Sequence, residues 1–382
     1  MKLVYVFALL IAITNTESFS FNAFPFLSTV ATAVPTTPVV ETSLFVPKEL
    51  KSVVKTVAVA GATGRTGQVV VQTLLNEGVS QVVAVVRDEE KARNVLPINS
   101  PQLKIVKADF GTSFEQVLES VDATIWCATG FSNNPSQQWM DKIRSLLGMA
   151  LLPKRSIDLI ALPNIAQALS KNKNNDGLPK LVVCSSAGVT RPTWSDDKKK
   201  RLVGAADIPI VRLNPFGILD IKRESEERLR ETCNECNVPY TIVRPAGLND
   251  DWPAGSRPIF SQGDVAVGRI NRKDVARILV DTLTTPSAVG KTFEVVAVAG
   301  YPPATTMETA LSRLRTDKDG LPSDEIINAV YHTMQQLLPG EKQNSAGLAM
   351  GQTYEQMDQG ETGRLGERGQ EDAASAAPKP TS

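Results

Sequence analysis

Three glycines near the start of the chain have a spacing that suits a phosphate group. Gly61, Gly64 and Gly67 follow a short apolar run, Val57 to Ala60, and precede a stretch with helical periodicity over 68–77. Glycines permit a tight turn and a close backbone approach to a pyrophosphate, and the N-terminus of the following helix presents N–H groups to it. Because strand, loop and helix occur in this order, the sequence predicts a dinucleotide site. The residues expected to contact the dinucleotide are Gly61, Thr63, Gly64, Arg65, Thr66 and Gly67.

The residue after the second apolar run bears on which dinucleotide binds. Arg87 follows Gln81 to Val86. Sites selective for NAD place an acidic residue there to hold the ribose 2′-hydroxyl, whereas an arginine suits a 2′-phosphate. Arg65 could stack on the adenine or reach the same phosphate. We therefore expect NADP(H) to be preferred over NAD(H), with a solvated strand end beside Asp88 and Glu89 as the alternative role of Arg87.

The elements that must position these residues alternate from Lys55 onward. Continuous runs of Val, Ile and Ala indicate strands buried on both faces, so the predicted fold is an α/β, doubly wound parallel sheet of the Rossmann type. Pro163 lies inside one predicted helix and predicts a kink or a later start. The expected strands are 57–60, 81–86, 103–108, 123–128, 181–185, 240–243 and 293–298, and the expected helices are 68–77, 157–171, 221–237 and 273–283.

The chain changes in character after Val298. Helical patterns occur over 305–314 and 324–338, and from Gly340 onward Gly, Gln, Glu, Ser and Ala dominate. A segment this polar cannot offset the entropy lost on ordering. We therefore expect a Rossmann domain over 51–300, a small helical extension over 301–339 and a disordered tail over 340–382. Within the tail, 350–366 could order on a protein partner.

The first fifty residues are typical of targeting. Lys2 precedes the apolar run Leu3 to Ile13, and small residues stand at −3 and −1 of a cleavage site before Phe19. The pattern predicts a signal peptide over 1–18, because the apolar run is too short to be a transmembrane span.

The segment 19–50 is a transit or linker segment rich in Ser, Thr, Ala and Pro. Together with Ser18-Phe19-Ser20-Phe21, it resembles the bipartite presequence of algae with secondary plastids. The resemblance implies a plastid location, and the alternative is the secretory pathway. Two observations argue against secretion. The sequence has no Asn-x-Ser/Thr acceptor for glycosylation, and its four cysteines do not look like a disulfide framework.

Four segments resemble the atypical, extended, NmrA-like branch of the short-chain dehydrogenase/reductase family, in its plastid form. They are 61–67 (GATGRTG), 182–189 (VVCSSAGV), 241–248 (TIVRPAGL) and 270–276 (INRKDVA), and the resemblance covers about 55–298. It implies a cofactor lying over the strand ends. In that position Asp109 and Phe110 flank the adenine, Ala128 and Thr129 line the adenosine ribose, and Pro245 and Leu248 border the nicotinamide. From the residues alone, Asp109 could instead cap a helix, and Pro245 could simply mark the end of a strand.

The same resemblance bears on catalysis. Orthodox members combine a serine after the fifth strand with Tyr-x-x-x-Lys, in which the tyrosine transfers the proton as hydride moves. Ser186 and Lys222 match the serine and the lysine and are the catalytic candidates, and Lys222 is also expected at the nicotinamide ribose. Ile218 stands where the tyrosine belongs. Two functions remain: an NADP(H)-dependent oxidoreductase with another proton donor, or a non-catalytic NADP(H)-binding scaffold or assembly factor for photosynthetic complexes.

Composition argues against several other classes. Lys+Arg and Asp+Glu are balanced at 41 each, which gives no field for nucleic acid. The single histidine, His332, lies in the predicted extension, and no cluster of His and Cys predicts a metal. Cys233 and Cys236 form a C-x-x-C on a charged helix, where surface cysteines are the simpler interpretation, and Lys198–Arg201 is expected to be a solvated loop. The insertion 130–179 matches no pattern that identifies a small-molecule substrate.

Overall fold

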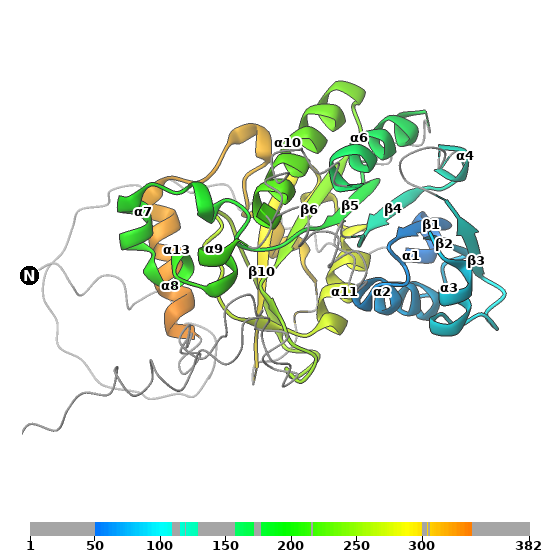
Figure 1. Cartoon of the computed structure of the whole chain (residues 1–382), viewed down its shortest axis with the longest axis horizontal. Helices are drawn as coiled ribbons and strands as arrows, with labels where there is room; N and C mark the ends of the chain where they lie inside the picture. Colours follow the sequence, from blue (N-terminus) through cyan, green and yellow to red (C-terminus); the bar gives the residue numbers. More distant parts are fainter. Residues whose placement is uncertain are drawn as a thin grey trace, which may run out of the picture. The chain divides into compact units, whose positions relative to one another are not determined.

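Eight strands form one sheet in the described part of the chain (Figure 1). The computed structural model describes residues 50–108, 115–118, 120–128, 157–171, 177–214, 217–299, 304 and 306–337. The strand order is β3-β2-β1-β4-β5-β6-β10-β8. The strands are β1 (Thr56–Ala60), β2 (Gln81–Val86), β3 (Leu103–Lys107), β4 (Ala123–Trp126), β5 (Leu181–Cys184), β6 (Tyr240–Pro245), β8 (Arg257–Ser261) and β10 (Lys291–Val298).

The seven predicted strands are confirmed, and they pair in parallel. The expectation of a wholly parallel sheet needs one correction, because β8 pairs antiparallel with β10 at the sheet edge. β8 contains Pro258, which an edge strand tolerates since one side needs no ladder hydrogen bond. A separate parallel pair, β7 (Gly247–Leu248) and β9 (Arg269–Ile270), was also not predicted.

Helices cover both faces of the sheet, as the buried strand runs require. One core unites the sheet with α1 (Leu50–Val53), α2 (Arg65–Asn76), α3 (Glu89–Val95) and α11 (Arg272–Thr282). The other unites it with α4 (Glu115–Leu118), α6 (Ile157–Ser170) and α10 (Ile218–Cys236). Figure 1 shows α6 and α10 on one side of the strands and α2 and α11 on the other. The doubly wound fold class is therefore confirmed.

Pro163 does not delay the start of α6. The helix runs over Ile157–Ser170 with the proline inside it, so the carbonyl of Leu159 has no partner four residues on. Leu162, Ile165 and Leu169 are fully buried against the sheet. Tertiary packing of this apolar face maintains the helix despite the lost hydrogen bond.

The described residues between β5 and α10 contain several short helices. These are α7 (Asp196–Arg201), α8 (Val203–Ala206) and α9 (Pro209–Leu213), preceded by the short 3-10 turn η3 (Arg191–Thr193). Lys198–Arg201, predicted as a solvated loop, forms the last turns of α7. The Ser195 hydroxyl accepts the Lys198 N–H at the helix start, and the basic residues lie at its C-terminal end, where the helix dipole favours cations.

The two predicted C-terminal helices are present as α12 (Glu308–Ser312) and α13 (Asp324–Leu337), with the 3-10 turns η5 (Pro286–Ala288) and η6 (Asp317–Asp319) nearby. Leu311 belongs to the same core as α2 and α11. Ile327, Tyr331 and Met334 of α13 pack with Trp194 and with residues of the sheet. None of the described helices is both long and apolar enough to cross a membrane. The predicted presequence and the tail from Gly340 lie outside the described residues.

Candidate functional site

The glycine loop between β1 and α2 has no room for side chains at two positions. A Cβ on Gly61, which has φ of +75°, would lie 2.5 Å from the backbone nitrogen of Ala128. A Cβ on Gly67 would lie 2.2 Å from the carbonyl oxygen of Gly61. The loop therefore lies directly against the end of β4, and α2 packs directly onto the loop.

The start of α2 offers donors to an anion. Its first helical hydrogen bond runs from the Gln68 N–H to the Gly64 carbonyl, at 2.9 Å. The amides of Arg65, Thr66 and Gly67 precede this bond, where helix N–H groups have no intrahelical acceptor. Thr63 and Thr66 are half-buried beside them. The residues of this loop thus fit a dinucleotide pyrophosphate, with the backbone close and the helix dipole favourable.

The register of the sheet brings the predicted Arg87 to the same edge. Ala60 of β1 pairs with Val85 of β2, so Arg87 lies beside the glycine loop at the carboxyl end of β2. Its side chain is exposed. The adjacent Asp88 accepts the Lys91 N–H at 3.0 Å and caps α3. The carboxylate of Asp88, which is next to Arg87 in the sequence, therefore caps the N-terminus of α3.

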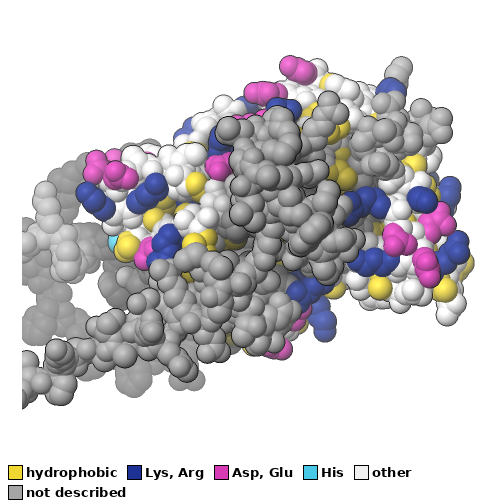
Figure 2. Space-filling view, viewed as in Figure 1, with side chains coloured by type: hydrophobic (Ala, Val, Ile, Leu, Met, Phe, Trp, Pro, Cys, Tyr) yellow, Lys and Arg dark blue, Asp and Glu magenta, His cyan; other side chains and the backbone are white. Residues whose placement is uncertain are grey.

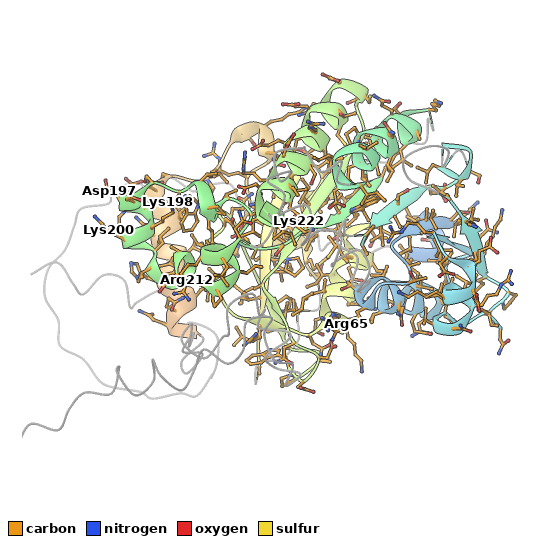
Figure 3. All side chains as sticks on the ribbon, viewed as in Figure 1. Arg65, Asp197, Lys198, Lys200, Arg212 and Lys222 are labelled. Atoms are coloured by element: carbon orange, nitrogen blue, oxygen red, sulfur yellow. The ribbon has the colours of Figure 1, made fainter. Side chains whose placement is uncertain are left out.

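An ion pair of the phosphate loop was not predicted. The Arg65 guanidinium lies 3.2 Å from the Asp250 carboxylate, from which it is separated by 185 residues in sequence. Arg272, at the start of α11, contacts the same carboxylate. Asn271 donates to the carbonyls of Asp250 and Trp252 and so fixes this loop. Two arginines therefore converge on one acidic residue at the phosphate loop (Figure 3 labels Arg65).

The two catalytic candidates lie at the carboxyl edge of the sheet, Ser186 in the turn after β5 and Lys222 on α10. Lys222 is a buried side chain of α10 and interacts electrostatically with Cys127 and Cys184. Figure 3 places Lys222 over the middle of the sheet, apart from the labelled charges of α7 and α9. The Ser186 hydroxyl donates to the carbonyl of Ala187 at 2.9 Å. The hydroxyl of Ser186 therefore donates its hydrogen bond within the turn to which Ser186 belongs.

Ser185, rather than Ser186, reaches α10. Its hydroxyl donates to the Glu226 carboxylate at 2.6 Å, one helical turn beyond Lys222. Glu226 is buried and is paired with Arg244 and Arg230. Burial raises the pKa of Glu226, but these arginines and Ser185 outweigh it and leave the pKa below its usual value. A buried ionised carboxylate therefore fixes the turn after β5 to α10.

A second buried carboxylate holds the rest of that turn. Asp264 has a left-handed backbone, with φ of +63°, and accepts the N–H groups of Gly188 and Thr190 at 2.6 and 2.7 Å. The fully buried Arg191 donates to the Asp264 carbonyl at 2.7 Å. The loop that carries Ser186 is thus anchored to the segment between β8 and α11. Sequence reasoning missed this, because Asp264 is 76 residues from Gly188.

No tyrosine in the described part of the chain lies beside Lys222. Ile218, at the tyrosine position, packs with the small apolar cluster of Val189 and Val211. The Tyr240 hydroxyl donates to Asp317 at 3.0 Å, and burial followed by the charge of Asp317 raises the pKa of Tyr240. The Tyr331 hydroxyl accepts the N–H of Gly204 in α8. These two tyrosines serve the packing of the extension.

The remaining predicted contacts divide between described and undescribed residues. Pro245 ends β6 and accepts the Ala187 N–H at 2.9 Å, so it lies beside the serine turn. Leu248 is half-buried in β7 and packs on the α2 core. Ala128 follows β4 and abuts Gly61. Asp109, Phe110 and Thr129 lie outside the described residues.

Two thiols at this edge were not singled out by the sequence. Cys127 follows β4 and Cys184 ends β5, and both are half-buried. Trp126 pairs with Val183, so these two cysteines lie opposite each other on neighbouring strands. The C-x-x-C cysteines lie elsewhere, on α10, where burial followed by Cys236 raises the pKa of Cys233 to about 12.

This geometry agrees with the comparison to protein families. The model of the NAD(P)H-binding family matches residues 61–286, from the first glycine of the loop to the turn after α11. The chain therefore belongs to the NAD(P)H-binding family, as the resemblance in its motifs predicted.

Individual relatives are similar over much of the chain. An uncharacterized chloroplastic protein of Arabidopsis thaliana is 32% identical over 265 residues, which cover 66% of this chain and 81% of that protein. A short-chain dehydrogenase/reductase from Veillonella parvula, solved in complex with NADP, has a TM-score of 0.45 at 16% identity and covers 66% of this chain and 99% of its own. An anaerobilin reductase from Escherichia coli O157:H7 has a TM-score of 0.44 at 17% identity, covering 65% and 100%.

Proposed function

We propose that this protein binds NADP(H) in a plastid and is an atypical short-chain dehydrogenase/reductase that lacks the usual catalytic tyrosine. The observation that carries the proposal is the steric fit of the glycine loop, where Gly61 and Gly67 leave backbone and helix N-terminus open to a pyrophosphate. When bound, the nicotinamide supplies or accepts a hydride. The chain's own contribution is to bind it through 61–67, Arg87, Ala128, Lys222, Pro245 and Leu248, together with Asp109, Phe110 and Thr129.

The preference for NADP(H) rests on Arg87 and Arg65. An exposed guanidinium at the end of β2 can pair with a 2′-phosphate through two parallel hydrogen bonds. We expect NADPH to bind more tightly than NADH in calorimetry. Arg87→Ala is expected to remove most of the difference by weakening the affinity for NADPH roughly tenfold to a hundredfold.

Arg93→Ala is the matched control, because Arg93 is an exposed arginine on α3 whose side chain pairs with Glu89. Its removal changes the net charge equally but leaves the end of β2 intact. Equal affinities of the native protein for NADPH and NADH would contradict the proposed preference.

Catalysis is proposed to be weak. A positioned proton donor contributes roughly 10² to 10⁴ in rate, and the apolar Ile218 cannot donate. Lys222 is instead expected to hold the ribose, with Ser186 near the reacting group. We expect NADPH oxidation against a panel of aldehydes, ketones and quinones to stay far below the ~10 per second typical of enzymes, while calorimetry shows full binding. Turnover near that typical value would contradict this, and would place an unrecognised donor in the 130–179 insertion.

The second candidate is a non-catalytic NADP(H)-binding scaffold or assembly factor. It is favoured by the apolar residue at the tyrosine position and by a polar segment, 340–382, suited to binding a protein partner. Co-purification from isolated plastids followed by mass spectrometry distinguishes the two. Recovery of stoichiometric photosynthetic subunits, lost on truncation after Pro339, supports the scaffold. Recovery of the protein alone supports the oxidoreductase.

The plastid location is supported by the presequence pattern and by the chloroplastic relative. We infer a signal peptide over 1–18 and a transit segment over 19–50 ahead of the nucleotide-binding domain. Fusion of residues 1–50 to a fluorescent protein is expected to direct it into the plastid. A matched fusion in which Phe19 is changed to Ala is expected to stop short of it, and secretion of the native fusion would support the alternative destination.

A further inference from the structure

Cys127 and Cys184 lie on neighbouring parallel strands at matching positions. Trp126 of β4 pairs with Val183 of β5, so the next residues, Cys127 and Cys184, are opposite each other. Both side chains pack against the same core, that of α2 and α11, and so point to the same face. Neighbouring strands are about 4.8 Å apart, within the range of roughly 4.4–6.8 Å that a disulfide spans between Cα atoms.

The register places the two thiols side by side at the ends of the two strands. Both are half-buried, and each affects the pKa of the other. Thus the pair needs no backbone rearrangement to bring sulfur near sulfur, and the partial exposure leaves an approach for a small reagent.

Two cations from opposite layers face this pair. Lys222 comes from α10 and Arg272 from the start of α11. The neighbouring Cys127 thiol lowers the pKa of the Cys184 thiol, burial opposes this, and Lys222 and Arg272 lower it further. The neighbouring Cys184 thiol and burial raise the pKa of Cys127. Cys184 is therefore the thiol with the greater tendency to ionise.

We propose that Cys127 and Cys184 are a redox-active dithiol that closes to a disulfide across the ends of β4 and β5 by exchange with a small disulfide such as oxidised glutathione. The Cys184 thiolate attacks one glutathione sulfur and releases the first glutathione thiolate, which takes up a proton. Cys127 then loses its proton and attacks the Cys184 sulfur, releasing the second glutathione. The protein dithiol loses two electrons and two protons, and the small disulfide gains them.

A consequence for the cofactor rests on the function proposed above. Ala128 follows Cys127 and abuts the glycine loop, and Ser185 follows Cys184, so the dithiol lies at the edge where NADP(H) is proposed to bind. Bound NADPH is expected to shield the pair and slow its oxidation. Closing the disulfide also removes the ionisable thiol on which Lys222 and Arg272 act.

The test is a redox titration of the full chain with mixtures of oxidised and reduced glutathione, followed by intact mass and peptide mapping. We expect the loss of two hydrogens and a peptide linked through Cys127 and Cys184. Cys127→Ser is expected to stop at the mixed disulfide, with one glutathione added, and Cys184→Ser to remain largely unmodified. A linkage at Cys233 and Cys236, or a native protein that keeps four free thiols, would overturn the proposal.

Two controls make the result specific. A Cys233→Ser, Cys236→Ser variant removes the other pair and is expected to titrate like the native protein. Alkylation by iodoacetamide across pH is expected to modify Cys184 first, and at lower pH than Cys233; the opposite order would count against the proposal. Repeating the titration with saturating NADPH tests the shielding alone, so a failure there leaves the disulfide intact and counts against the cofactor site.

Discussion

At the scale of single residues, Asp250 sets the charge of the phosphate loop. Its carboxylate pairs with Arg65, which is proposed to reach a phosphate of the cofactor, and with the neighbouring Arg272. We predict that Asp250→Asn raises the affinity for NADPH, because the competing anion is removed while the arginines stay. An exposed ion pair contributes about 0.2–1 kcal/mol, so the expected gain in affinity is about 1.4-fold to fivefold, and it shrinks at high salt.

Calorimetry at two salt concentrations measures this effect. Asp251→Asn is the matched control, since Asp251 is the adjacent exposed acid and has the same charge. If Asp250→Asn weakened binding, the carboxylate would have to contact the ligand directly, and the arrangement of competing charges would be wrong.

Among the described glycines, Gly67 leaves the least room for a side chain. A methyl group there would lie 2.2 Å from the Gly61 carbonyl oxygen, which is a backbone atom and cannot rotate away. We predict that Gly67→Ala abolishes NADPH binding and lowers the free energy of unfolding by about 1–3 kcal/mol. Chemical denaturation and calorimetry check the two effects, with Gln72→Ala on the exposed face of α2 as the control. Native-like binding by Gly67→Ala would show that the loop does not hold the pyrophosphate.

The role of a residue can be predicted from the sequence when the pattern that indicates it lies in neighbouring residues. The loop glycines were found because strand, turn and helix are contiguous and each requires a recognisable residue type. Asp250 and the pairing of Cys127 with Cys184 have no local signal, since both arise from segments that meet only in the folded sheet. The same holds for Glu226, which is one more acid on a charged helix until the structure places Ser185 and Arg244 against it.

At the scale of elements, continuous burial made the parallel strands predictable. Every residue from 57 to 60 and from 82 to 86 is buried, so an unbroken apolar run was sufficient evidence. β8 was missed because an edge strand is half-exposed and carries Arg257 and Pro258. The helices α7 to α9 were missed because four to six residues are too few to show a periodicity.

The strand β10 carries a buried acid that makes stability depend on pH. Burial and the nearby Asp264 raise the pKa of Glu294 to about 7, against the opposing charge of Arg244, and Arg191 also faces it. The folded protein therefore binds a proton that the unfolded chain has released between about pH 4.5 and 7. Stability contributed at this position is present at low pH and falls as pH rises through that window.

We predict that Glu294→Gln removes this part of the pH dependence. As the pH rises from 4.5 to 8, the free energy of unfolding of the variant should increase relative to that of the native protein by on the order of 1–3 kcal/mol. Denaturant titrations at several pH values measure the difference, and Glu308→Gln, an acid on α12, serves as the control. A difference between native and Glu294→Gln that is constant with pH would mean that Glu294 keeps one protonation state throughout.

At the scale of the whole molecule, charge is spread rather than concentrated. Figure 2 shows Lys and Arg interleaved with Asp and Glu on the visible face, in keeping with 41 residues of each sign. A mixed surface provides no long-range field for a polyanion. Recognition is therefore expected to depend on local features such as the phosphate loop.

The boundary of the folded body is predicted to lie between α13 and the tail. Truncation after Pro339 should leave the melting temperature and NADPH binding unchanged. Truncation after Gly320 removes α13 and uncovers the partners of Ile327, Tyr331 and Met334, each of which contributes about 1.5–3 kcal/mol on burial. Thermal unfolding of the two truncations compares them directly. A large fall in melting temperature for the longer truncation would show that the tail packs on the body.

The pairing of α2 with α11 has a consequence for how the chain acquires its structure. Glu77 at the end of α2 and Arg277 of α11 form an ion pair between residues 200 apart. The first strand and its phosphate loop are therefore synthesised long before the helix that covers them. Closure over such a separation has a large entropic cost and makes folding slow. Until the last third of the chain emerges, the side of α2 that packs on α11 stays uncovered, and a chaperone has both the time and the surface to bind it.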